Sequence, residues 1–264
     1  MTFETLRLTE RDPIRAFLNQ DRRMTAYAIG DLDDAFWPQS IFYGARRDGR
    51  LESVLLVYGG FDPPVLTAFG AAEGVHAIFE QQTLPEEIYF LCPPEIESAL
   101  RTWYDTPNCH REWRMVLDTR VFQPVQAREV ARIGPEHADA LTDLYRQAAE
   151  PGEAIVAFDP WQIAHGAFFG VWDRADLIAA AGTHVWSPGE GVAAIGNVFT
   201  RPDCRGRGHA TRCTTAVARE ALLAGIDTVI LNVRQDNNPA VHVYRKLGFR
   251  VCGSFLEGPG LKRG

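Results

Sequence analysis

The stretch VFTRPDCRGRGHATR, from Val198 to Arg212, carries most of the information about how this 264-residue chain folds and what it binds. An apolar strand is expected to end near Thr200, and a helix is expected to begin after Gly206 and Gly208. Glycines at alternate positions let a backbone approach a ligand closely, and the first turn of a helix offers N–H groups backed by the positive end of its dipole. The stretch therefore predicts a cradle for a phosphate or pyrophosphate.

Positive charge gathers around this loop although the protein is acidic overall. The chain has 27 Lys+Arg against 34 Asp+Glu, a formal net charge of −7, and four arginines flank the glycines: Arg201, Arg205, Arg207 and Arg212. A negative molecule repels nucleic acid and anionic membranes. The sequence predicts a local anion site, with neither nucleic acid nor membrane as a partner.

Three other interpretations of the glycines compete with this one. A P-loop requires a lysine after the glycines, and none follows here. A dinucleotide fingerprint requires a third glycine where Thr211 stands, and it requires more parallel strands than follow this loop in the sequence. One feature agrees with it, since Asp227 lies near the expected acidic position. A glycine loop with a purely structural role is the third interpretation, and it stays open on the motif alone.

The elements around the loop predict a mixed αβ domain of the α+β class. An amphipathic pattern favours a helix over residues 135–148, and tight turns join three expected antiparallel strands. The helix that ends before Gly225 connects strand 192–200 to the apolar strand 228–233. A connection through a helix implies that these two strands are parallel. The expected elements after the first helix are strands 168–172, 177–186 and 192–200, helix 209–224, strand 228–233, helix 239–247 and strand 249–255.

The first half of the chain shows nearly the same order of elements. Strands are expected at 41–46, 51–58, 65–69, 88–92 and 113–117, and helices at 71–82 and 94–104. Pro124 lies in a segment between two strand-like runs, 113–117 and 128–133, which places a domain boundary near residue 122. The sequence predicts two domains, residues 1–122 and 123–264, related by structural duplication; an unrelated first domain is the alternative.

Composition narrows the class of protein. With 46% hydrophobic and 23% charged residues, the chain resembles an ordinary globular protein. No apolar run is long enough for a spanning helix, and the N-terminus has no secretory signal pattern, so a cytoplasmic location is expected. The five cysteines form no C-x-x-C pair, which indicates reduced thiols and no metal site.

The glycine loop resembles the acetyl-CoA-binding motif of the GNAT (Gcn5-related N-acetyltransferase) family, Arg/Gln-x-x-Gly-x-Gly/Ala, which Arg205, Gly208 and Ala210 match. A second stretch, from Asn237 to Phe249, is similar to the family's other conserved region. The resemblance implies a GNAT fold with a splayed central sheet for residues 123–264. It also implies that residues 1–122 are a degenerate copy without a cofactor, since they have no matching glycine loop.

The resemblance implies a site for acetyl-CoA as co-substrate, with no metal. The pantetheine arm is expected along the end of the central strand, and the pyrophosphate on the amides that follow. The implied cofactor-binding residues are Val198, Phe199, Thr200, Arg205, Gly206, Arg207, Gly208, His209, Ala210, Thr211 and Asn237. For Asn237, a role as a turn residue accounts for the side chain equally well.

Tyr244 corresponds to the tyrosine that protonates the departing CoA thiolate in many relatives, and packing in the core is its alternative role. Many relatives carry a glutamate as general base on the preceding strand, but AAIGNVF here has no carboxylate. Substitutes acting through water are His184, Glu190, Glu153 and Asp159. Cys204 has arginine neighbours, but no evident histidine partner at fixed spacing except His209, which argues against a nucleophilic role.

The function implied by the resemblance is direct transfer of the acetyl group of acetyl-CoA to an amine, on a small molecule or a protein. A non-catalytic acetyl-CoA-binding regulatory module is the alternative, because the strand carboxylate is missing. A dinucleotide-dependent oxidoreductase is a third hypothesis. Aromatic residues stand where relatives place their acceptor-binding loop, but core packing explains them as well: Phe158, Trp161, Phe168 and Phe169. The sequence does not indicate an oligomeric state.

Overall fold

The structure is a computed structural model that describes residues 3–147 and 158–264. Its chain forms two compact units, which are described separately. Unit 1 comprises Met1–Arg114, Arg234–Asp236 and Val251–Gly264; unit 2 comprises Met115–Val233 and Asn237–Arg250.

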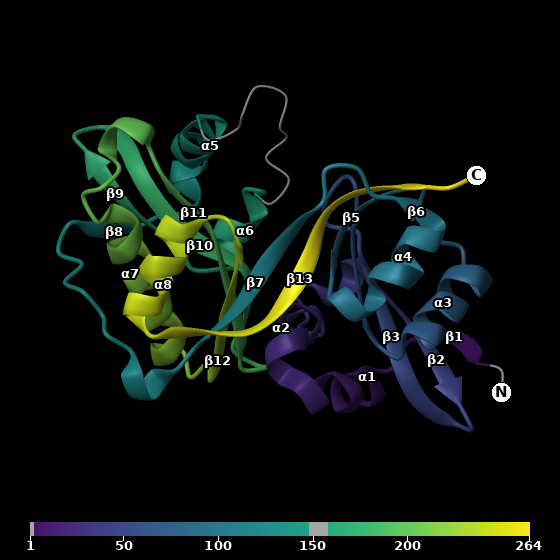
Figure 1. The fold of residues 1–264 in the computed structure, drawn as a ribbon. Helices are drawn as coiled ribbons and strands as arrows, with labels where there is room; N and C mark the ends of the chain where they lie inside the picture. Colours follow the sequence, from purple (N-terminus) through teal and green to yellow (C-terminus); the bar gives the residue numbers. More distant parts are fainter. Residues whose placement is uncertain (1–2, 148–157) are drawn as a thin grey trace. The chain divides into compact units, whose positions relative to one another are not determined.

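Unit 1 is a mixed sheet with helices between its strands (Figure 1). Its strands pair in the order β1-β2-β3-β4-β5-β13, with β6 also pairing with β13. All these pairings are antiparallel except β4 with β5, which is parallel. In chain order the elements are β1 (Glu4–Leu8), α1 (Arg11–Leu18), α2 (Arg22–Gly30), β2 (Ser40–Arg47), β3 (Arg50–Tyr58), β4 (Val65–Gly70), α3 (Ala72–Gln81), β5 (Glu87–Cys92), α4 (Glu97–Trp103), β6 (Tyr104–Asp105) and β7 (His110–Leu117), whose last three residues belong to unit 2.

Unit 2 repeats the arrangement. Its strands pair in the order β12-β11-β10-β9-β8, and only β11 with β12 is parallel. The expected antiparallel hairpins and the parallel pair are therefore confirmed. The elements are β8 (Val130–Arg132), α5 (Ala138–Arg146), α6 (Trp161–Ala164), β9 (Phe169–Asp173), β10 (Asp176–Ser187), β11 (Val192–Thr200), α7 (His209–Leu223), β12 (Thr228–Arg234) and α8 (Asn238–Leu247). The last strand, β13 (Phe249–Lys262), begins in unit 2 and belongs to unit 1 from Val251 onward.

The two units share one order of elements, which confirms the mixed αβ class and the duplication. A strand, two helices and three antiparallel strands come first, and a helix, a parallel strand and another helix follow. The series runs from β1 to α4 in unit 1 and from β8 to α8 in unit 2. The strand β1 and the helices α1 and α2 were not predicted from the sequence.

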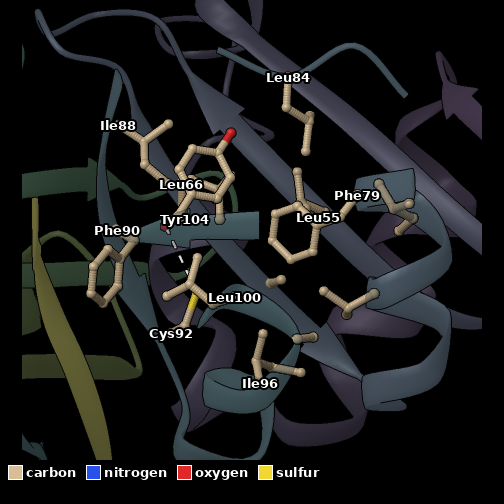
Figure 2. Close-up of a cluster of buried hydrophobic side chains, with 14 of the residues drawn as sticks. Leu55, Leu66, Phe79, Leu84, Ile88, Phe90, Cys92, Ile96, Leu100 and Tyr104 are labelled. Carbon is tan, nitrogen blue, oxygen red and sulfur yellow. Dashed lines mark hydrogen bonds between the residues drawn. The ribbon is translucent and has the colours of Figure 1, made fainter. Parts of the chain in front are cut away.

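Each unit has its own apolar core. In unit 1, side chains from β3, β4, β5, α3 and α4 pack together, among them Leu55, Leu66, Phe90 and Leu100, and Figure 2 shows them converging. Tyr104 lies in the same cluster and its hydroxyl donates a hydrogen bond to the carbonyl of Pro85 at 2.7 Å. In unit 2, residues of α5 and α6 pack on β10. Burial of these apolar side chains is the main stabilising contribution in both units.

The strand β13 is longer than expected and supports unit 1. The sequence predicts a strand that ends near residue 255, whereas β13 continues to Lys262. Leu256 to Leu261 pair antiparallel with β5, beside which β13 is drawn in yellow in Figure 1. A single boundary after residue 122 thus differs from the compact units, because the chain returns to unit 1 after Arg250. The division of function between residues 1–122 and 123–264 stays a prediction.

Two further observations concern the described residues. None of their helices is both long and apolar enough to cross a membrane. All five cysteines are free thiols; Cys92, Cys204 and Cys213 are buried.

Unit 1 buries two ionisable side chains that contact or end α2, Arg114 and Asp31. Arg114 has no exposed surface; its guanidinium lies 4.0 Å from the ring centroid of Phe255 and donates to the carbonyl of Met24 at 2.7 Å. Asp31, at the end of α2, is 7% exposed, and burial raises the pKa of its carboxyl to about 8. The folded state therefore holds a proton on Asp31 at pH values where the unfolded chain has released it.

We predict that Asp31 makes unit 1 less stable as the pH rises. A raised carboxyl pKa contributes stability below about pH 4, and this contribution is lost between about pH 4 and pH 8 because the native state binds the extra proton. Asp31→Asn should raise the free energy of unfolding by roughly 1–3 kcal/mol at pH 9 and have little effect at pH 4. Thermal unfolding of both proteins across this range measures the difference.

Asp34→Asn is the matched control. Asp34 is also an aspartate, three residues after Asp31, but its carboxylate is exposed and forms an ion pair with Arg11. Its unfolding should show the wild-type dependence on pH. A stability difference between Asp31→Asn and wild type that is the same at pH 4 and pH 9 would contradict the prediction.

Candidate functional site

The site begins where β11 separates from β12. Parallel pairing runs from Val192, opposite Thr228, to Ile195, opposite Leu231. Beyond Ile195, β11 continues to Thr200. This part of the strand still pairs with β10 but no longer pairs with β12. Burial changes at the same point, since Val192 to Ile195 are buried and the next five residues are half-exposed. The second half of β11 thus leaves one edge of its backbone open to a ligand.

Two β-bulges face each other at this point. Between the pairs Ala180–Phe199 and Gly182–Gly196, β11 has two residues, Asn197 and Val198, opposite one residue of β10. Between the pairs Thr183–Ile195 and Val185–Ala194, the extra residue is His184 of β10, and β11 has no residue opposite it. Bulges bend a strand and change the direction of its side chains. The expected splayed sheet therefore has a local cause in the register of β10 and β11.

The glycine loop follows directly. Gly206 and Gly208 both have φ of +79°, and a Cβ on either would meet nothing within 4 Å. Gly208 is the N-cap of α7, and no side chain caps the helix there. His209, Ala210 and Thr211 form the first turn of this 15-residue helix. The loop thus presents backbone N–H groups at an open helix N-terminus, an arrangement that suits an anion.

The arginines around the loop differ in their contacts. Arg205 donates through Nε to the carbonyl of Thr200 at 3.1 Å and lies 5.7 Å from the ring centroid of Phe199, so it ties the loop to the end of β11. Arg201 is paired with Asp203 at 2.7 Å. Arg207 is exposed beside the two glycines. Arg205 and Arg207 therefore supply the positive charge that is available to a ligand at the loop.

Arg212 and Thr200 show that the residues present fit a pyrophosphate. Arg212 contacts the Nδ1 of His209 at 2.9 Å and the carbonyl of Arg207 at 3.2 Å, but its buried Nε has no hydrogen-bond partner among the described residues. The buried Oγ1 of Thr200 also has none in the described part of the chain. Buried polar atoms without partners are costly. Both atoms flank a loop whose glycines leave room for a phosphate, so the residues fit this group.

The residues expected on α8 lie apart from the loop in sequence and have structural contacts of their own. Asn237 is the N-cap of α8, and its Oδ1 accepts a hydrogen bond from the backbone N–H of Ala240 at 3.2 Å. Tyr244 is 6% exposed and meets Phe249 edge-on at 6.0 Å between ring centroids. The helix packs against α7. The binding role of Asn237 and the proton transfer by Tyr244 stay predictions.

The candidate bases occupy different places. His184 stands in the bulge of β10, and burial lowers its pKa to about 4, so its ring is neutral at pH 7. Glu190 lies in the turn before β11, and the nine residues of that strand span roughly 30 Å, so it is remote from the loop. The Oδ1 of Asp159 accepts from the N–H of Trp161 at 2.7 Å. Glu153 lies outside the described residues.

Cys204 and three of the aromatic residues make contacts within unit 2. Cys204 is 4% exposed, and its sulfur accepts a hydrogen bond from Arg201 at 3.5 Å. Phe168 is fully buried in the core of unit 2, and a Cβ on Gly182 would lie 2.1 Å from its ring. Phe158 packs against this core, whereas Trp161 stacks on His165 with 4.0 Å between ring centroids.

A possible cation-binding arrangement exists in unit 1 and not at the glycine loop. One ligand atom from each of His110, Glu112 and Glu257 lies within 4.8 Å of the others. Burial raises the pKa of both glutamates, and the hydroxyl of Tyr89 donates to Glu257 at 2.8 Å. These are the described residues whose geometry could hold a metal ion, and the sequence did not single them out.

Sequence reasoning missed the residues that hold the bulge of β11. Asn197 has a left-handed backbone with φ of +52°, and its carbonyl accepts a hydrogen bond from the hydroxyl of Tyr145 at 2.6 Å. Its side chain is hydrogen-bonded to His184 and donates to Gln162 at 3.4 Å. The pair Gly196-Asn197 within an apolar strand is the signal that could have indicated a bulge.

Sequence comparison agrees with this geometry. The sequence pattern of the Acetyltransferase (GNAT) family matches residues 136–249. A protein named mycothiol acetyltransferase from Geodermatophilus obscurus is 31% identical over 143 residues, which are 53% of this chain. The chain spans 43% of the length of that relative.

Solved structures share the fold over almost the whole chain. A GCN5-related N-acetyltransferase from Sphaerobacter thermophilus has a TM-score of 0.58 at 15% identity, covering 99% of this chain and 96% of that one. A tandem GNAT protein from the clavulanic acid biosynthesis pathway has a TM-score of 0.54 at 14% identity and covers 100% and 99%. The glycine loop and the splayed strands lie within the part of the chain, residues 136–249, that matches the Acetyltransferase (GNAT) family.

Proposed function

We propose that this protein transfers the acetyl group of acetyl-CoA to an amine, with unit 2 holding the acetyl-CoA. The observation that carries the proposal is the open edge of β11 leading directly into an uncapped helix N-terminus with two left-handed glycines. The family match over residues 136–249 supports it.

Different residues are proposed to bind different parts of acetyl-CoA. Val198, Phe199 and Thr200 offer the free backbone edge of β11 to the pantetheine arm, as a further strand would use it. The amides from Gly206 to Thr211 would receive the pyrophosphate, because they belong to the glycine loop and to the first turn of α7, whose N–H groups have no partner within the helix. Arg205 and Arg207 add charge, and Asn237 holds the start of α8 through its cap to Ala240.

Acetyl-CoA supplies a thioester, an acyl group activated for attack. In the transfer, a bond forms between the amine nitrogen and the acyl carbon, and the carbon–sulfur bond breaks. The amine loses one proton and the CoA sulfur gains one. We assign the second proton to the hydroxyl of Tyr244, a phenol on the helix that packs against α7. The group that receives the first proton is not assigned, since β11 carries no carboxylate.

Unit 1 is proposed not to bind acetyl-CoA, although it has the same order of elements. At the matching turn, a Cβ on Gly70 would lie 2.1 Å from the carbonyl oxygen of Glu52, and one on Gly74 would lie 2.3 Å from the Oγ of Ser53. The backbone of β3 therefore fills the space that is open at Gly206 and Gly208. Glu73 also places a negative charge in the first turn of α3.

The acceptor proposed for testing is an amine of the kind suggested by the relatives' name, a mycothiol-related compound. Since the chain spans less than half of those relatives, other small-molecule and protein amines belong in the same panel. A cytoplasmic location and the absence of nucleic-acid and membrane partners remain predictions of the sequence.

We predict that Gly208→Asp weakens acetyl-CoA binding. An aspartate at the N-cap would accept hydrogen bonds from the first-turn N–H groups and place a negative charge beside the pyrophosphate. Like charges about 4 Å apart repel by roughly 1–4 kcal/mol, so the affinity should fall at least about fivefold. Calorimetric titration of acetyl-CoA measures the change.

Gly225→Asp is the matched control for this substitution. Gly225 also has φ of +79° and open space around it, but it follows the C-terminal end of α7. Both variants carry the same backbone strain and the same added charge, and only Gly208→Asp should weaken binding. Equal affinity of both variants for acetyl-CoA would show that the cradle is not at this loop.

We predict that Tyr244→Phe lowers kcat roughly 100-fold or more while acetyl-CoA binding stays within about threefold of wild type, as expected for loss of a general acid. The ring remains to pack against Phe249, so the fold should be kept. Chromatographic detection of free CoA with the amine panel measures turnover. Tight binding of acetyl-CoA with no turnover of any amine by the wild type would favour a regulatory acetyl-CoA-binding module instead.

A further inference from the structure

The left-handed residue Asn197 is held in place by a neighbouring helix. Its φ of +52° is a conformation that costs energy for a residue with a side chain, and asparagine tolerates it better than most residues. The hydroxyl of Tyr145, on α5, donates to the carbonyl of Asn197 at 2.6 Å. A strained backbone persists only where its surroundings hold it. The bond from Tyr145 is one such restraint, applied directly to the strained peptide.

Tyr145 is suited to act as a permanent donor. Its side chain is 4% exposed and packs edge-on against Phe158 with 5.0 Å between ring centroids. Burial raises the pKa of its hydroxyl well above the usual value, so the proton stays on the oxygen at every pH used for an assay. The ring belongs to the apolar core formed by α5, α6 and β10. The hydroxyl is therefore fixed relative to the sheet.

The location of the bulge matters for the reaction. Asn197 is the second residue after Ile195, the last residue of β11 that pairs with β12. A cofactor whose pyrophosphate lies at Gly206 to Thr211 would extend along Val198 to Thr200 towards this point. The bulge therefore lies at the acyl end of the proposed site, and the glycine loop at the other end.

We propose that Tyr145 is a positioning residue for acyl transfer, acting through the carbonyl of Asn197 to fix the bulged backbone against which the acetyl group lies. This inference rests on the proposed function of unit 2. It assigns no contact between Tyr145 and the substrate. Small displacements of a reacting group reduce rates strongly, so the effect should appear on the acetyl group and spare the rest of CoA.

The test compares acetyl-CoA with CoA in calorimetric titrations of the full chain. Tyr145→Phe removes one oxygen and keeps the ring. Affinity for CoA should stay within twofold of wild type, while the ratio of acetyl-CoA to CoA affinity should change at least threefold. With any acceptor found in the amine panel, kcat should fall about tenfold or more and the KM for the acceptor should change less than kcat.

Tyr104→Phe is the matched control in unit 1. Tyr104 is fully buried, and its hydroxyl donates to the carbonyl of Pro85 at 2.7 Å, so its substitution removes the same kind of hydrogen bond. Both variants should lower the melting temperature by similar amounts, but only Tyr145→Phe should change the ratio of affinities and kcat. Equal changes in both, or a loss of stability alone in Tyr145→Phe, would show a merely structural role and overturn the proposal.

A second pair of variants tests the backbone itself. Asn197→Gly adopts a positive φ freely and keeps the carbonyl that Tyr145 bonds, whereas Asn197→Ala must carry the strain without the hydrogen bonds of the asparagine side chain. The glycine variant should keep kcat within about threefold, and the alanine variant should match Tyr145→Phe. If Asn197→Gly lost kcat while Tyr145→Phe kept the wild-type kcat, the positioning role would belong to the Asn197 side chain, and the proposal for Tyr145 would be refuted. Wild type that does not bind acetyl-CoA would instead refute the proposed function.

Discussion

The end of parallel pairing between β11 and β12 is the constraint on which the site depends. Four residue pairs hold the strands together, and after Ile195 the two diverge. A sheet that stayed paired would leave no backbone edge for a ligand. The facing bulges at His184 and Asn197 give β11 a new direction without breaking its pairing with β10. The direction of β11 in turn positions the glycine loop and α7, since both come directly after this strand in the chain.

Unit 1 shows that the fold and the site are separable. Both units have the same order of strands and helices and one parallel pair of strands each. They differ in the turn after the central strand, where β3 occupies the space beside Gly70 in unit 1. Two glycines with room around them, Gly206 and Gly208, distinguish the proposed phosphate cradle from the closed turn of unit 1. The apolar cores are maintained by burial in both units, and this requirement is independent of any ligand.

Local signals made much of this structure predictable. The helix α7 was predicted to end before Gly225, and α8 was predicted over residues 239–247, because the signals that start and end a helix act within about one turn of the chain. The glycine loop was also found locally. By contrast, the extension of β13 beyond residue 255 depends on β5 as a partner, which no local pattern reveals. The hydrogen bond between Tyr145 and Asn197 joins residues 52 positions apart, and the pKa of Asp31 depends on burial under a tertiary fold.

The pairing of β13 with β5 has a consequence for synthesis of the protein. Tyr89 and Glu257, which are hydrogen-bonded across these strands, are 168 residues apart. On the ribosome, β5 therefore emerges long before its partner, and its edge stays uncovered while all of unit 2 is translated. Uncovered strand edges bind other chains readily. The first unit made is thus the last to be completed, and a nascent chain of this protein needs protection of β5, by its own fluctuating segments or by a chaperone, until residues 256–261 arrive.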